Sequence, residues 1–188
     1  LEELDNNYIK LNVIDLKAQA EFNWQIFKGL KYNFTGAIRY VRSKQEHEIH
    51  ENSNMANAYR AAGNSTIREN NPYLYKDPSD PSAEPIVVLS KGGFYNTAEN
   101  LLLNYDIRNS VSFSKIWNEK HEFNALLGQQ IKYSDRQTNS NTGYGFQYDM
   151  GGTVSMNYLI MKQMIEQNFD YYSRALTYDR FAAFYANV

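Results

Sequence analysis

Two histidines within a run of carboxylates are the side chains best suited to chemistry. His47 and His50 are interspersed with Glu46, Glu48 and Glu51, and imidazole and carboxylate groups are ligands for zinc and related metals. In an extended chain, however, positions 47 and 50 point to opposite faces. We therefore interpret this run as a solvated, charged segment and predict no metal site.

No other combination of residues predicts catalysis. The glycines at positions 143, 145, 151 and 152 match neither a GxGxxG motif nor a P-loop, and no Ser/His/Asp set or isolated carboxylate pair stands out. The chain has no Cys, which excludes disulfides and thiolate metal sites. We therefore expect no enzyme activity and no cofactor.

Aromatic side chains in two long polar connections are better candidates for ligand binding. We predict that these residues contact a substrate: Tyr73, Tyr75, Tyr95, Tyr144, Phe146 and Tyr148. Aromatic faces bordered by Asn and Asp are a common means of holding sugars or peptides, because ring faces are apolar and amides form hydrogen bonds. The alternative is that these rings pack against one another or against a partner protein.

The charge balance limits the class of partner. The 188 residues include 19 basic and 21 acidic side chains, a net charge of −2 with no basic patch, so we expect no nucleic-acid binding. The mean hydropathy is −0.64, and no apolar run reaches the roughly 18 residues of a membrane helix. A transmembrane β-strand escapes that test, because only alternate residues face lipid.

Long β-strands are the elements that must position these side chains. From residue 14 to residue 26 apolar and polar residues alternate strictly, which is the period of a strand with one apolar face. The alternation resumes at Leu30, and a three-residue loop ending at Gly29 pairs Ile26 with Leu30. Gly29 suits the left-handed conformation that such a loop requires. We predict a hairpin over residues 12–47.

The same layout occurs again later in the chain. Alternation predicts a second hairpin over residues 97–134, with its turn at 117–120, and another strand at 171–188 whose apolar face is ambiguous. Phe181, Ala183 and Tyr185 compete there with Phe184, Ala186 and Val188.

Two long loops connect these strands. The loop over 48–96 contains a short helix at 54–62 and a short strand at 86–89, and the loop over 135–170 contains a segment, 154–167, that favours a helix over a strand pair. We interpret the chain as a segment of one longer domain.

Each face of the predicted sheet has its own chemistry. Aromatic residues on the apolar face gather near the short turns, as at a membrane interface: Phe22, Trp24, Tyr32, Phe34, Phe113, Trp117 and Phe123. The polar face includes charged residues that would line a lumen: Lys17, Arg39, Asp106 and Arg108.

Alternation alone does not distinguish a lipid-facing apolar face from one that covers a soluble core. The strand length, the aromatics sorted by height and the short turns alternating with long loops favour lipid. We therefore predict an all-β fold, an antiparallel transmembrane β-barrel segment of about five long strands with long extracellular loops. A soluble β-sheet carbohydrate-binding module with Tyr-rich loops is the alternative.

Three stretches carry a family resemblance. The sequences FNWQIFKGLKYNFTGAIRY, SVSFSKIWNEKHEFNALLGQQ and YDRFAAFYANV resemble barrel strands of the SusC/RagA family of TonB-dependent transporters. The resemblance implies a 22-stranded barrel with a plug domain outside these residues, in the outer membrane of a Gram-negative, Bacteroidetes-like cell. It also implies import of oligosaccharides or peptides with a SusD-like lipoprotein, using energy delivered by TonB.

Overall fold

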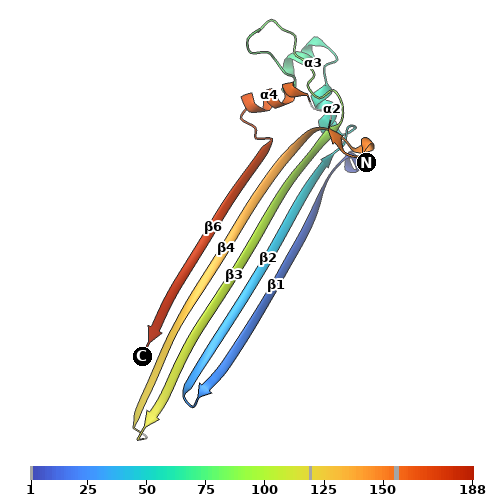
Figure 1. The fold of residues 1–188 in the computed structure, drawn as a ribbon. Coiled ribbons are helices and arrows are strands. Elements are labelled where there is room, and N and C mark those ends of the chain that lie inside the picture. The colour runs from blue at the N-terminus through green and yellow to red at the C-terminus, as the bar shows by residue number, and fades with distance from the viewer. Residues whose placement is uncertain (1, 119, 155–156) are drawn as a thin grey trace. The chain divides into compact units, whose positions relative to one another are not determined.

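The computed structural model describes residues 2–118, 120–154 and 157–188. Five long strands dominate it (Figure 1). They are β1 (Asn7–Phe27), β2 (Leu30–Ile49), β3 (Gly93–Trp117), β4 (His121–Gln147) and β6 (Tyr172–Asn187), and β5 (Thr153–Val154) is a two-residue strand. The helices are α1 (Glu2–Asn6), α2 (Asn54–Arg60), α3 (Ser65–Asn70) and α4 (Tyr158–Glu166), and η1 (Tyr148–Met150) is a 3-10 helix.

The strands form one open antiparallel sheet. Their order is β1-β2-β3-β4-β5, and β6 also pairs with β4. The predicted all-β class with about five long antiparallel strands is therefore confirmed. Among the described residues, β1 and β6 each pair with a single strand. Within the same described ranges, no helix is long and apolar enough to cross a lipid bilayer.

Each of the two tight turns contains a residue with a positive φ, as predicted for the first of them. Gly29 has a φ of 98°, the left-handed value predicted for the end of the first loop. Its carbonyl accepts a hydrogen bond of 2.8 Å from the N–H of Ser114 in β3. In the second turn Asn118 has a φ of 51°, and Asn is one of the few side chains that tolerate this region. The predicted turn also includes position 119, which lies outside the described residues.

The predicted pairing of β1 with β2 extends along both strands. The N–H of His50 donates to the carbonyl of Asn6 at 2.7 Å. The register that pairs Ile26 with Leu30 also places Asn6 opposite His50 when it is continued to the far end of the hairpin. The apolar residues of the two strands therefore share one face, as the alternation predicts.

The strands are longer than predicted, most of all β4. The sequence pattern ended the second hairpin at residue 134, but β4 continues to Gln147, and residues 135–147 are not a loop. The N–H of Thr142 donates to the carbonyl of Tyr171 at 2.8 Å, where β4 meets the start of β6. This part of β4 has no apolar alternation, and backbone pairing does not require one, so the pattern missed it.

The other boundary predictions had mixed outcomes. The first hairpin runs from Asn7 to Ile49, wider than the predicted 12–47, and β3 begins at Gly93, so the first loop is shorter than 48–96. The helix expected at 54–62 is confirmed as α2. The helix expected at 154–167 is confirmed as the shorter α4; Val154 belongs to β5, and positions 155 and 156 lie outside the described residues. The strand expected at 86–89 was wrong, because only Ile86 pairs, in an isolated bridge with Tyr75.

Two compact units make up the chain. The loop unit comprises Leu1–Asn12, Lys44–Glu99 and Asn139–Arg174, and the strand unit comprises Val13–Ser43, Asn100–Thr138 and Ala175–Val188. The long strands contribute residues to both units.

The loop unit has a buried core. Every buried hydrophobic side chain among the described residues belongs to it: Ile49, Ala56, Tyr59, Leu74, Tyr75, Val88, Leu89, Phe94, Ile160 and Met164. Side-chain caps define the short helices around this core. Ser53 accepts a hydrogen bond from the N–H of Ala56 at the start of α2, and Asn64 does the same for Ile67 at the start of α3.

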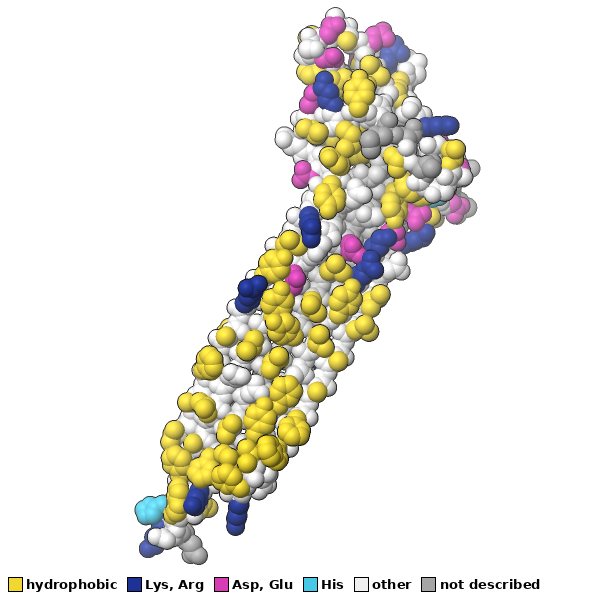
Figure 2. Space-filling view, in the orientation of Figure 1, with side chains coloured by type: hydrophobic (Ala, Val, Ile, Leu, Met, Phe, Trp, Pro, Cys, Tyr) yellow, Lys and Arg dark blue, Asp and Glu magenta, His cyan; other side chains and the backbone are white. Residues whose placement is uncertain are grey.

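The strand unit leaves its apolar side chains uncovered. Leu16, Trp24, Leu127 and Phe184 are 62%, 54%, 62% and 79% exposed, respectively. Figure 2 shows hydrophobic side chains spread over the strands on the face in view. The strand unit is therefore a sheet without a core on its apolar side.

The register of β6 on β4 settles which face of β6 is apolar. Phe184 lines a shallow groove together with Leu127 and Val111 of the apolar face. Tyr185 packs on the opposite side, where a Cβ added to Gly128 would lie 2.3 Å from its ring. The face of Phe184, Ala186 and Val188 is thus continuous with the apolar face of β3 and β4.

Candidate functional site

The structure distributes the six predicted substrate-contacting aromatics over two groups in the loop unit. Tyr75 lies in the core at 4% exposure. Tyr73 stacks on the core residue Tyr59, with ring centroids 4.1 Å apart, and Tyr144 meets the core ring of Phe94 edge-on at 5.7 Å. Their packing matches the alternative that such rings contact one another, and burial raises the pKa of Tyr59 to about 12.

The other three aromatics form a connected cluster. Tyr95 stacks on Phe146 at 4.8 Å, and Phe146 meets Tyr148 edge-on at 4.7 Å. Tyr148 in turn stacks on His50, with centroids 4.0 Å apart and an angle of 5° between the rings. The Tyr148 hydroxyl donates to the carbonyl of Phe94 at 2.6 Å, and burial raises the pKa of that hydroxyl. These contacts hold the rings in fixed positions.

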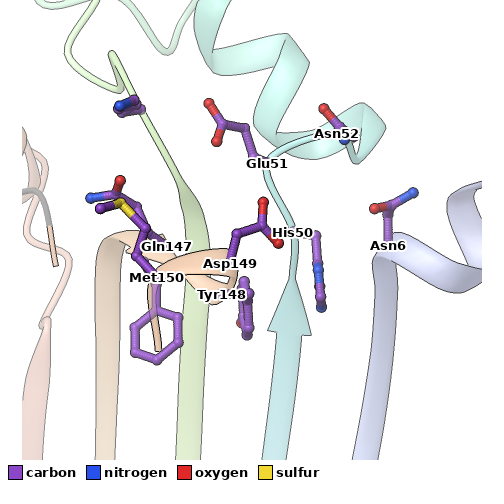
Figure 3. Close-up of a pocket in the computed structure, with 10 residues that line it drawn as sticks. Asn6, His50, Glu51, Asn52, Gln147, Tyr148, Asp149 and Met150 are labelled. Atoms are coloured by element: carbon purple, nitrogen blue, oxygen red, sulfur yellow. The ribbon is translucent and has the colours of Figure 1, made fainter. Parts of the chain in front are cut away.

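A pocket of about 260 Å³ lies beside this cluster (Figure 3). Its lining comes from the end of α1, from both ends of the loop between β2 and β3, from the end of β4 and from η1: Asn6, His50, Glu51, Asn52, Lys91, Phe146, Gln147, Tyr148, Asp149 and Met150. We refer to this cavity as the aromatic pocket. Figure 3 shows His50 and Tyr148 side by side, with Glu51 and Asp149 nearby.

The Glu48 carboxylate lies beside the His50 ring. This carboxylate accepts hydrogen bonds from the Tyr8 hydroxyl and from Lys10, each at 2.7 Å, and lies 3.8 Å from Nε2 of His50. The Tyr8 hydroxyl also lies 3.4 Å from that nitrogen. Burial alone would raise the pKa of Glu48, but the hydrogen bonds from Lys10 and Tyr8 outweigh burial and hold it below its usual value.

A second carboxylate, that of Glu46, contacts the aromatic cluster at Tyr95. Glu46 accepts hydrogen bonds from Lys44, at 2.7 Å, and from the Tyr95 hydroxyl. These two bonds lower the pKa of Glu46, the one from Lys44 most. The aromatic cluster therefore rests on two ionised, hydrogen-bonded carboxylates.

The aromatic pocket combines ring surfaces with groups of every hydrogen-bonding type. Asn6, Asn52 and Gln147 supply amides, which both donate and accept. Glu51 and Asp149 supply carboxylates, and Lys91 supplies an ammonium group. Such a lining suits a small polar ligand with an apolar side.

The two histidines do not meet. His47 contacts Asn7, with 2.6 Å between Nε2 and the amide oxygen, whereas His50 stacks on Tyr148. Across the part of the chain that the structure describes, no group of three or more His, Cys, Asp or Glu side chains is arranged to hold a metal.

The charged residues predicted to line a lumen lie on the polar face of the strand unit and are largely paired. Arg39 donates to both carboxylate oxygens of Asp15, at 3.0 and 2.6 Å. Arg108 contacts both oxygens of Asp106, at 3.3 and 3.0 Å. Lys17, exposed on β1, shares the polar face with Asp15.

The predicted interface aromatics also cluster by their turns. Phe123 lies 6.2 Å from both Phe113 and Trp117, ring centroid to ring centroid. Phe22 and Trp24, of the first hairpin, are each 54% exposed. Their contact with a membrane interface remains a prediction, as does substrate contact by the loop aromatics.

Sequence reasoning missed Tyr8 and Glu48 as parts of the aromatic pocket's support. Tyr8, His50 and Tyr148 come from three separate segments, and no spacing in the sequence links them.

No protein-family model matches this chain, and no curated protein matches it.

Proposed function

We propose that this chain forms part of the wall of an outer-membrane β-barrel that imports nutrients, of the SusC/RagA type. The observation that carries the proposal is the uncovered apolar face of the strand unit. Among the described residues, the strand unit contributes none of the buried hydrophobic side chains, yet its strands alternate apolar and polar residues.

Energetics support a lipid environment for this face. Covering a single Leu, Phe or Ile side chain is worth roughly 1.5–3 kcal/mol, and exposed apolar patches of this extent are rare on soluble monomers. A bilayer covers such a face without any protein partner. The polar face, with the Asp15–Arg39 and Asp106–Arg108 pairs, then borders a wet lumen.

Strand length agrees with this assignment. A tilted transmembrane strand needs about 9–11 residues to cross the hydrocarbon, and β1, β2, β3, β4 and β6 have 21, 20, 25, 27 and 16 residues. The excess length would extend beyond the bilayer. The loop unit then faces the exterior, where it meets substrate and a SusD-like lipoprotein.

The import function rests on the family resemblance together with the aromatic pocket. An importer of this type takes up oligosaccharides or peptides, with energy delivered by TonB through parts of the protein outside these residues. The ring surfaces, amides and mixed charges of the aromatic pocket suit either class of substrate.

Cell fractionation and growth test the proposal. We expect the full-length protein that contains this chain to fractionate with outer membranes, and its deletion to abolish growth on one polymer or its oligomers. A matched strain lacking an unrelated outer-membrane protein controls for general envelope damage. Recovery of the intact protein in the soluble fraction would overturn the proposal.

A soluble carbohydrate-binding module is the second candidate, and the core of the loop unit favours it. Residues 1–188 alone would then give a soluble monomer that unfolds cooperatively. A barrel segment with two unpaired edges would instead aggregate without detergent. Size-exclusion chromatography and denaturant unfolding of the purified chain distinguish the two candidates.

A further inference from the structure

Strand β6 places two aromatic rings on the polar face of the strand unit. Phe181 lies beneath the ammonium group of Lys132, with Nζ 5.8 Å from the ring centroid. Tyr185 lies over Gly128, which is buried beneath it. Phe181 and Tyr185 are 51% and 42% exposed. We call these two rings the wall platform.

Gly128 leaves room for the end of the Tyr185 side chain against the sheet. A Cβ at this position would come within 2.3–2.5 Å of three atoms of the Tyr185 side chain, closer than any real contact. The glycine therefore creates a seat for the ring on β4. The ring occupies this space while 42% of the residue stays exposed.

Hydrogen-bonding groups border the wall platform. Asp106 accepts from Arg108 and, at 3.0 Å to each oxygen, from the amide of Gln130. Lys132 lies 3.9 Å from the same carboxylate. Two cations thus share one anion, so this cluster has an excess positive charge and several N–H donors.

The spacing of the rings suits an extended ligand. Phe181 and Tyr185 are four residues apart on one face, which at about 3.3 Å per residue separates them by roughly 13 Å along the strand. A linear oligosaccharide presents apolar C–H faces to rings and hydroxyls to neighbouring amides and charged groups. A peptide lying on this face would instead need partners for its backbone N–H and C=O groups, and the two ring faces of the wall platform supply none.

We infer that the wall platform of Phe181 and Tyr185, bordered by Gln130 and Lys132, is a contact site for an oligosaccharide passing along the polar face of the sheet. This inference rests on the proposed import function and narrows its substrate class to carbohydrate. It also adds a site that is separate from the aromatic pocket.

Binding measurements on the full-length protein in detergent test the inference. The probe is the set of oligosaccharides released by partial hydrolysis of the polymer on which the deletion strain fails to grow. Phe181→Ala and Tyr185→Ala should each weaken binding about two- to tenfold, the range expected for losing one ring contact. Tyr185→Phe retains the ring and should bind nearly as tightly as the native protein.

Phe184→Ala is the matched control, since Phe184 lies on the opposite face of the same strand and is 79% exposed. It should leave binding unchanged. Native-like electrophoretic mobility of every variant before heating confirms that each one is folded.

Three results would overturn the inference. They are unchanged binding in both ring variants, equal weakening by Phe184→Ala, and a deletion strain that loses growth on peptides alone. A protein recovered in the soluble fraction would instead count against the proposed function, so the two failures are distinguishable.

Discussion

The loop unit and the strand unit treat large apolar side chains in opposite ways. Phe94 in the loop unit is 1% exposed, whereas Phe184 in the strand unit is 79% exposed. The loop unit buries its large apolar side chains in a core of its own, and the strand unit exposes them on one face of its sheet. The difference teaches that a chain with a mean hydropathy of −0.64 can contain both a buried apolar core and an open apolar face, and that average composition conceals this.

The largest effect is expected from truncating the core of the loop unit. Phe94→Ala removes a ring that packs against Tyr59 and Tyr144, which should cost about 3–5 kcal/mol of local stability. Amide hydrogen exchange of the full-length protein should accelerate in peptides of the loop unit and not in those of the strand unit. Ile86→Ala, at a side chain that is 52% exposed, is the control. Equal acceleration in both units would contradict their separation.

A charge on the apolar face tests the strand unit directly. Ala20→Arg should destabilise the assembled protein by about 2–4 kcal/mol if this face meets lipid. The neighbouring Gln19→Arg points to the polar face and should change stability by no more than about 0.5 kcal/mol. The measurement is the amount of heat-modifiable, folded protein in outer membranes. Equal tolerance of both variants would show that the apolar face is solvated.

The Glu48 carboxylate, close to the aromatic pocket, should make the stability of the loop unit sensitive to acid. The pKa of Glu48 is lower in the folded state than its usual value of about 4.3. Its contribution to stability is therefore complete above that value and is lost as the pH falls through the folded pKa. Glu48→Gln should cost about 1–2 kcal/mol near neutral pH and flatten the acid dependence of hydrogen exchange. Glu69→Gln, at an exposed position, should do neither.

The smallest effect concerns a polar residue on the apolar face. Asn109 interrupts that face, and its amide oxygen accepts a 2.6 Å hydrogen bond from the Tyr32 hydroxyl. Tyr32→Phe should cost about 1 kcal/mol, measured as a shift in the urea midpoint of the folded protein. Tyr105→Phe keeps the ring that stacks on Tyr133 and should cost less. An unchanged urea midpoint in Tyr32→Phe would mean that the Tyr32–Asn109 bond contributes nothing.

Most of the fold was predictable because the strand unit repeats one simple signal. Alternation from residue 14 to residue 26 and the suitability of Gly29 for a left-handed turn are local properties, and both were confirmed. Residues 135–147 were not predicted as part of a strand because their sequence does not alternate between apolar and polar residues. Backbone hydrogen bonds pair these residues without such an alternation. The apolar face of β6 was ambiguous because it depends on how β6 aligns with β4.

The candidate site was less predictable than the fold. The loop aromatics were identifiable by composition, but whether a ring enters the core, as Tyr75 does, or borders a pocket, as Tyr148 does, depends on tertiary packing. The stack of His50 on Tyr148 joins residues about a hundred positions apart. No spacing rule within a strand or helix reaches that far.

The hydrogen bond between the Gly29 carbonyl and the Ser114 amide has a geometric consequence for the proposed barrel. The first hairpin ends level with Ser114, whereas β3 continues to Trp117, so adjacent hairpin tips are stepped. A sheet that closes into a cylinder needs such offsets, since their sum fixes the tilt of the strands and the diameter of the cylinder. In the proposed barrel, an insertion that moved this bond by two residues would therefore alter the width of the lumen and not only its rim.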